Sequence, residues 1–125
     1  MKKIMIFSIL AILFFNCKKS KEDYRDKWCG TYSGEYTHEV YTSTVYVIST
    51  YNETIEVRKS GDNELFIQDF NEAAKVDKVG RIDMELTDCK ISAFFINDSL
   101  YINKSTAIPA ENVSNSFRGR KLIKN

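Results

Sequence analysis

The feature that most constrains the fold is a two-residue alternation of apolar and polar side chains, which starts at Trp28 and continues almost to the C-terminus. The alternating segments are rich in Thr, Tyr, Val, Ile and Phe, residues that favour strands because they pack well on a pleated surface. The clearest segment is 81–87, where Ile82, Met84 and Leu86 alternate with charged or polar residues. No convincing helical period follows Trp28, so we expect an all-β domain.

Turn-forming residues divide this region into about eight short strands. Hairpin turns are predicted at 60–63 and 97–98, which contain the Gly, Asn and Asp residues that tight turns need. The expected strands are 29–38, 40–49, 54–59, 64–68, a short one near 74–76, 80–87, 89–96, 99–103 and 114–123. Strands linked by turns without crossover helices indicate a small antiparallel up-and-down barrel or a sandwich. A closed barrel has the advantage that it leaves no exposed edge.

The N-terminal segment is of a different kind. Two lysines precede an apolar run at 4–15, which ends directly before Asn16 and Cys17. A run of about 12 residues is too short for a membrane-spanning helix, which needs about 20, but it suits the core of a signal peptide. Small residues of an ordinary cleavage site are missing at its end. We expect 1–16 to be a signal peptide.

Cys17 follows the apolar run and precedes the charged segment 18–26. In this position it resembles the lipidated cysteine of a bacterial lipoprotein, in particular of the small outer-membrane or surface lipoproteins of Bacteroidetes. The resemblance implies cleavage before Cys17 and acylation, for example by palmitate, of its sulfur and its new amine. Each buried methylene contributes about 0.8 kcal/mol, so two or three chains hold a protein on a membrane.

The same resemblance bears on location. Lys21, Glu22 and Asp23 are similar to the signal that exports some of these lipoproteins to the outer face of the outer membrane. We therefore expect an outer-membrane, lipid-anchored protein, on either the periplasmic face or the cell surface.

Parts of the mature chain, 25–32, 97–102 and 117–121, are similar to small lipocalin-like lipoproteins of uncharacterised function. The resemblance implies a barrel in which the opening glycine and aromatic residue lie where strand one closes the barrel, near a basic residue of the last strand. It implies an architecture and not an activity. The expected organisation is a signal peptide at 1–16, a lipidated cysteine and charged tether at 17–27, and a single β-domain at 28–125.

Two cysteines are left once Cys17 carries lipid. In an oxidising compartment Cys29 and Cys89 form an even pair, and a disulfide between them would close a loop of about 60 residues, stabilising the domain by about 4 kcal/mol. The alternative is two separate buried thiols, because sequence does not show whether two β-carbons meet.

No constellation of residues amounts to a catalytic or metal-binding signature. His38 is the only histidine, and we expect it to be exposed at a strand end. The carboxylate pairs Asp62/Glu64 and Asp83/Glu85 alternate with apolar residues, so they are predicted to face solvent rather than to form a glycosidase-type pair. We expect no enzymatic activity, no cofactor and no metal.

Two further features could carry function. Ser99, within Asp98-Ser99-Leu100, resembles an O-glycosylation site of this type of bacterium, although Asp-Ser is also ordinary turn chemistry. The tyrosines could recognise a ligand or could simply fill a small barrel. They cluster at positions 32, 36, 41, 46 and 51.

The net charge and its distribution bear on whether the partner is a nucleic acid. Loss of the two lysines in the signal peptide changes the net charge from +1 to −1, and the charges are interspersed, which argues against nucleic acid. We expect a monomeric, membrane-anchored, non-enzymatic binding or accessory module of the cell envelope, with an envelope protein, a glycan or a small apolar molecule as ligand. The alternative is an inhibitor lipoprotein that blocks a lysozyme or protease with a protruding loop, either 69–79 or 105–115.

Overall fold

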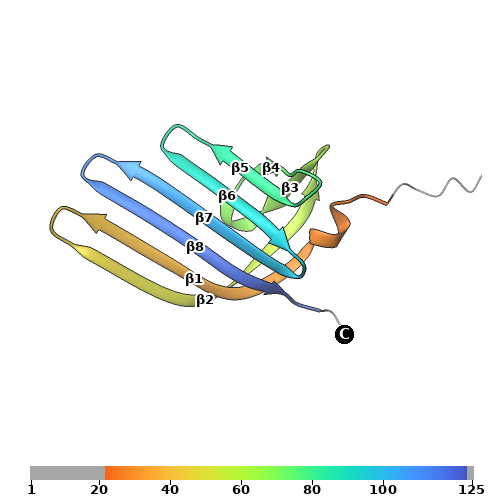
Figure 1. The fold of residues 1–125 in the computed structure, drawn as a ribbon, viewed down its shortest axis with the longest axis horizontal. Coiled ribbons are helices and arrows are strands. Elements are labelled where there is room, and N and C mark those ends of the chain that lie inside the picture. Colours follow the sequence, from red (N-terminus) through yellow and green to blue (C-terminus); the bar gives the residue numbers. More distant parts are fainter. Residues whose placement is uncertain (1–21, 124–125) are drawn as a thin grey trace, which may run out of the picture.

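The computed structural model describes residues 22–123. Their backbone forms one antiparallel sheet of eight strands (Figure 1). The strands are β1 (Gly30–Thr42), β2 (Tyr46–Ser60), β3 (Glu64–Ile67), β4 (Ala73–Lys75), β5 (Arg81–Glu85), β6 (Cys89–Ile96), β7 (Ser99–Ile108) and β8 (Glu111–Lys121). Two short 3₁₀-helices are η1 (Asp26–Trp28) and η2 (Gln68–Phe70). The described residues contain no α-helix, so the predicted all-β class is confirmed.

The strand order is β4-β3-β2-β1-β8-β7-β6-β5. Every pair of neighbours is consecutive in the chain except β1 and β8, which join the two ends of the sequence over Tyr32–Thr42 and Glu111–Lys121. β4 and β5, at the two ends of the sheet, lie near each other without forming a ladder. The fold is therefore an up-and-down barrel that is nearly closed, with its gap between β4 and β5.

One half of this sheet stays open, because β1, β2, β7 and β8 are much longer than the strands that complete the barrel. β3 pairs with β2 only over Val57–Ser60. In Figure 1 the β1–β2, β5–β6 and β7–β8 turns lie together at the end of the molecule away from β3, β4 and η1. We call residues 38–52 and 104–115 the open half, and the end that carries η1 the closed end.

The core fills the other half with side chains from every strand. Trp28 covers the closed end and stacks on Phe95, with 5.5 Å between ring centroids. The hydroxyl of Tyr32 donates to the Trp28 carbonyl at 2.9 Å, which ties η1 to β1. The fully buried side chains include Tyr32, Ile55, Leu65, Ile82, Ile91, Leu100 and Phe117. The barrel interior is thus packed with the protein's own residues.

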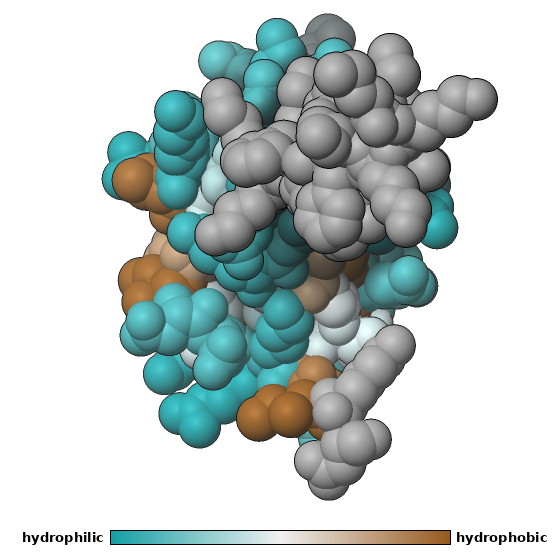
Figure 2. Space-filling view, turned by 90° about the vertical axis from the view of Figure 1, so that its right-hand side faces the viewer, coloured by the Kyte–Doolittle hydropathy of each residue, from teal (hydrophilic) through white to brown (hydrophobic). Residues whose placement is uncertain are grey.

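The described residues that Figure 2 shows at the closed end are mostly hydrophilic. Figure 2 looks at this end and shows separate apolar patches within a surface of polar and charged residues. The large apolar side chains exposed near it are Val79, Ile96, Leu122 and Ile123. Within residues 22–123, no helix has the length and apolar character needed to cross a membrane.

The first hairpin differs from the sequence prediction. Strands at 40–49 and 54–59 were expected, but β1 continues to Thr42 and β2 runs unbroken over Tyr46–Ser60. The turn between them is fixed by the Thr42 hydroxyl, which accepts the Val45 N–H at 2.9 Å. The Thr42 N–H also donates to the Val45 carbonyl at 2.8 Å. A threonine turn of this kind lacks the Gly or Asn signal that marks the hairpins predicted correctly at 60–63 and 97–98.

Both segments expected to form a protruding loop are structured. The segment 105–115 consists of the ends of β7 and β8, joined by a tight turn in which Ala110 has a φ of 70°. The segment 69–79 contains β4 and buries Phe70, Ala74 and Val76 in the core. Segment 105–115 is thus an ordered hairpin end and 69–79 packs against the core, and the inhibitor alternative stays a prediction.

The folded part begins earlier than Trp28, the predicted boundary. Arg25 donates to the carbonyls of Ser60, Gly61 and Glu64 at 3.0, 2.8 and 2.9 Å, and it forms a salt bridge with Asp23 at 2.7 Å. The predicted tether at 17–27 is therefore too long at its C-terminal end. The signal peptide and Cys17 lie outside the described residues.

Candidate functional site

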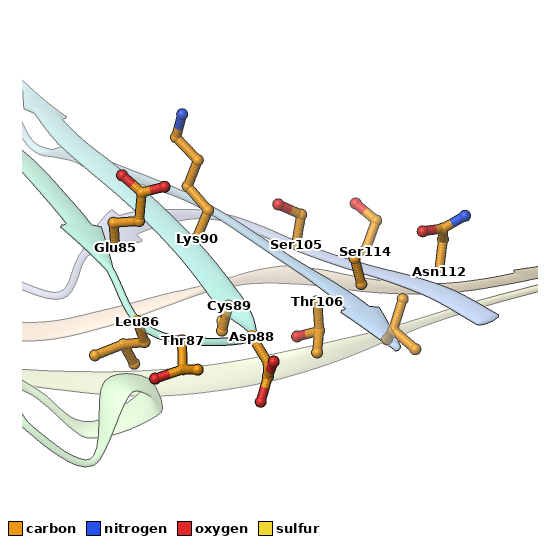
Figure 3. Close-up of a pocket in the computed structure, with 12 residues that line it drawn as sticks. Glu85, Leu86, Thr87, Asp88, Cys89, Lys90, Ser105, Thr106, Asn112 and Ser114 are labelled. Carbon is orange, nitrogen blue, oxygen red and sulfur yellow. The ribbon is translucent and has the colours of Figure 1, made fainter. Parts of the chain in front are cut away.

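A notch of about 430 Å³ lies where the β5–β6 turn meets β7 and β8. Its lining residues point to both sides of the sheet, as Figure 3 shows: Glu85, Lys90, Ser105 and Ser114 lie on one side, and Leu86, Cys89 and Thr106 on the other. A ligand site needs polar groups that converge on one point. The notch is therefore the rim of the sheet rather than a site.

A second hollow, of about 840 Å³, lies at the closed end between β1 and the C-terminal residues. Asp98 and Lys121 are its charged lining residues. Its lining extends to Ile123, the last described residue.

The inner face of the open half continues the wall of the barrel interior. Strand alternation from the buried Tyr36 places the next inward residues, and the strand register aligns them across the sheet. They are His38 and Val40 in β1, Val47, Ser49 and Tyr51 in β2, Lys104 and Thr106 in β7, and Val113 and Asn115 in β8. Val47 and Tyr51 are 49% and 50% exposed. This face therefore offers apolar and polar side chains to a partner.

Two carboxylates lie where this inner face meets the core. Glu53 comes from β2 and Asp69 from η2. One oxygen of each, Glu53 Oε2 and Asp69 Oδ2, is buried and accepts no hydrogen bond within the described chain. Native proteins rarely leave such atoms unpaired, since an unsatisfied buried acceptor costs about 1–3 kcal/mol. The pair is the strongest candidate in the described chain for a polar binding site.

Two tyrosines and a lysine surround the carboxylates. Tyr36 and Tyr51 stack with their ring centroids 5.2 Å apart. The Tyr36 hydroxyl and the positive charge of Lys104 both lie near enough to the Asp69 carboxylate to favour its ionised form and so lower its pKa. We call Tyr36, Tyr51, Glu53, Asp69 and Lys104 the carboxylate cluster.

Burial dominates the electrostatics of the carboxylate cluster. It raises the pKa of Asp69, and the opposing effects of Lys104 and the Tyr36 hydroxyl do not cancel it. The pKa of Glu53 is also raised, first by burial and then by the negative charge of Asp69. Burial likewise raises the pKa of Tyr36. The two carboxylates repel each other and are partly shielded from water. Each therefore readily accepts a proton or a hydrogen bond.

His38 differs from the exposed strand-end residue that was expected. It lies within β1, is half-buried, and its Nδ1 hydrogen-bonds to Oδ1 of Asn115 in β8. Asp83 and Glu85 do face solvent on β5, as predicted. Within residues 22–123, no three His, Cys, Asp or Glu side chains come together to hold a metal ion.

Cys29 and Cys89 are free thiols, so the disulfide alternative is wrong. Cys29 precedes β1 at the closed end, whereas Cys89 begins β6 beside the β5–β6 turn. β8 and β7 separate β1 from β6, and β6 runs opposite to β1, so the two residues lie at opposite ends of the barrel. Each packs against the edge of the core instead.

Ser99 is the first residue of β7 and follows the turn at 97–98, where Asn97 has a φ of 52°. It is partly exposed. The hairpin turn is confirmed, and O-glycosylation of Ser99 stays a prediction.

Sequence reasoning missed both carboxylates of the cluster. Glu53 has the same parity as the inward Ile55 and Val57 in β2, so alternation could have placed it. The expected strand began one residue too late, at 54. Asp69 lies in a 3₁₀ turn with no periodic pattern, so its position depends on how η2 packs against β2.

Neither a protein-family model, nor a curated protein, nor a solved structure matches this chain, so the interpretation of the site rests on its own geometry.

Proposed function

We propose that this protein is a lipid-anchored, non-enzymatic binding module of the cell envelope, and that it binds its ligand on the inner face of the open half. The N-terminal apolar run and Cys17 support the anchor. The observation that carries the binding site is the pair of unpaired oxygens on Glu53 and Asp69, next to the half-exposed Tyr51 and Val47.

The chemistry of these groups defines a ligand class. The two unpaired carboxylate oxygens can accept hydrogen bonds from a ligand group that donates them. The negative charge of the carboxylates favours a positively charged amine as that group. Exposed Val47 and the tyrosine stack suit an apolar body beside that group. The ligand is therefore a small amphipathic molecule with an apolar body and an amine or hydroxyl head.

The ligand head reaches the buried oxygens only after a side chain moves. Tyr51 is the exposed member of the carboxylate cluster, so its rotation about χ1 is the smallest such movement. Tyr36 is buried and stays in place. Binding then replaces the Tyr36–Tyr51 stack with contacts between the ligand and Tyr36.

A soluble form that begins at Lys18 tests the binding site. It retains the whole described core, which lies within residues 28–117. Amide NMR spectra are recorded with octylamine, octanol and octanoate, which share one apolar body. The proposal predicts that octylamine shifts the amides of Tyr51, Glu53 and Asp69, and that octanoate does not. Equal shifts by all three molecules, or shifts confined to the β5–β6 notch, contradict it.

The anchor is tested separately with the full chain in a Gram-negative host. Wild-type protein should incorporate labelled palmitate and sediment with membranes, because Cys17 supplies the only acylation site that the proposal names. Cys17→Ser should lose both properties, whereas Cys29→Ser should keep them. Incorporation of palmitate by the Cys17→Ser variant would rule out this anchor and would leave the proposal about the ligand site unaffected.

A further inference from the structure

The free edge of β2 is the least protected part of the described surface. On one side β2 pairs with β1 along Tyr46–Val57, but on the other side β3 reaches only Val57–Ser60. Among residues 22–123, no strand therefore lies beside residues 46–55 on this second side. From this edge we infer that two copies of the chain associate by pairing their β2 strands in an antiparallel two-stranded interface. The inference is argued from the backbone of this edge rather than from the carboxylates of the ligand site, and it replaces the expectation of a monomer.

The direction of the backbone groups can be derived from one contact. The N–H of Glu56 donates to the side-chain Oε1 of Gln68 at 3.3 Å, so it points away from β1. In an antiparallel strand, a residue's N–H and C=O point to the same side, and the side alternates along the chain. The even-numbered residues Tyr46, Ile48, Thr50, Asn52 and Thr54 therefore direct both groups toward the free edge.

Between Tyr46 and Asn52 this edge has none of the usual protection, and the inward-pointing Glu53 is the first charged residue after it. Natural edge strands are kept apart by charges, prolines, bulges or short length. Residues 40–52 contain no charged residue and no proline. By contrast, β4 and β5, which border the gap in the barrel, are short and carry charges such as Lys75, Arg81 and Asp83. The open stretch of β2 spans about 30 Å, at about 3.4 Å per residue.

The side chains on this edge suit a second copy of the same strand. Tyr46 and Ile48 are 58% and 54% exposed on the outer face, and Val47 and Tyr51 are half exposed on the inner face. A two-fold axis at Ser49 places Val47 opposite Tyr51 and Ile48 opposite Thr50 of the other copy. Aromatic and β-branched residues are favourable cross-strand neighbours. Because the stretch is uncharged, two copies bring no like charges together.

Two edge variants of the soluble form test this inference by sedimentation over a range of concentrations. Thr50→Pro removes an N–H that faces the edge and spares the ladder with β1, and Ile48→Lys adds a charge to the interface. We expect a wild-type dimer, and at least a tenfold weaker dimer for each variant. Asn103→Lys, which adds the same charge to an exposed position of β7, should dimerise like the wild type. Circular dichroism and melting confirm that each variant is folded.

Cysteine cross-linking tests the position of the axis, with Cys29 and Cys89 replaced by Ser. Ser49→Cys faces its own copy in a non-hydrogen-bonded pair, where a disulfide forms readily. Val47→Cys faces Tyr51 and should cross-link far more slowly. A monomeric wild type, a Thr50→Pro dimer as tight as wild type, or faster cross-linking through Val47→Cys overturns the inference. If the wild type is monomeric, the edge of β2 would be available to a strand of another protein instead.

Discussion

Asp69 sets how this domain should respond to pH. Its pKa is raised in the folded chain, chiefly by burial. When the pKa of a carboxyl group is higher in the folded state than in the unfolded state, the folded state keeps the proton up to a higher pH. Ionisation of the group therefore favours unfolding. Its contribution is neutral below the unfolded value of about 4 and becomes destabilising as the pH rises through the folded pKa. Glu53 acts in the same direction.

Replacing Asp69 by Asn should therefore stabilise the domain at pH 7, because it removes a buried negative charge. The gain should shrink to nothing toward pH 4, where the wild-type carboxyl is protonated. Thermal melts between pH 4 and 8 measure the difference, and NMR titration should show a lower pKa for Glu53 in the variant. A variant less stable than wild type at pH 7 would mean that Lys104 already satisfies the charge of Asp69.

Gly34 permits the close approach of β1 and β8. A Cβ atom there would lie 2.0 Å from the Arg118 carbonyl oxygen and 2.3 Å from the Gly119 Cα. Both atoms belong to the backbone, so no side-chain rotation relieves the clash. The contact lies in the β1–β8 ladder that closes the barrel.

Gly34→Ala should destabilise the domain by about 3 kcal/mol or more, because overpacking against a fixed backbone forces the two strands apart. Ser33→Ala is the matched control, since Ser33 is the exposed neighbour and should change stability by less than about 0.5 kcal/mol. Urea unfolding measures both variants. A Gly34→Ala protein as stable as its control would show that β1 and β8 are not held this closely.

At the level of elements, the sequence predicted the strands wherever turn chemistry was explicit. The turns at 60–63 and 97–98 contain Asn63 and Asn97, whose positive φ values fit their known tolerance for that conformation. The Thr42 turn gave no such signal, so the first hairpin was divided in the wrong place. Period-two patterning does not reveal where a strand ends when both of its faces carry apolar residues, as β2 does near Ile48.

The two ends of the barrel differ in structure and, under the proposal, in role. The described chain enters at the closed end, beside η1, and the open half ends in hairpin turns at the opposite end (Figure 1). Under the proposed anchor at Cys17, the open half faces away from the membrane and toward its ligand. The free edge of β2 lies in the same half, so two copies on one membrane could pair side by side.

The overall architecture was predictable from the sequence, but the candidate site was not. Alternation and turns suffice for an all-β barrel, because they depend on neighbours in the chain. The carboxylate cluster joins residues from β1, β2, η2 and β7, and its unpaired oxygens result from packing between those elements. The free edge likewise follows from the shortness of β3 relative to β2.

The central claim is that the carboxylates of Glu53 and Asp69 select the ligand's head group. It is tested most directly by the affinity of the soluble form for octylamine relative to octanol, in wild type and in the Glu53→Gln/Asp69→Asn double variant. Hydrogen bonds to charged groups contribute about 1.5–3 kcal/mol, so wild type should prefer octylamine by about tenfold or more. The double variant should lose this preference and still bind octanol. An unchanged preference in the double variant, or no preference in wild type, would contradict the claim.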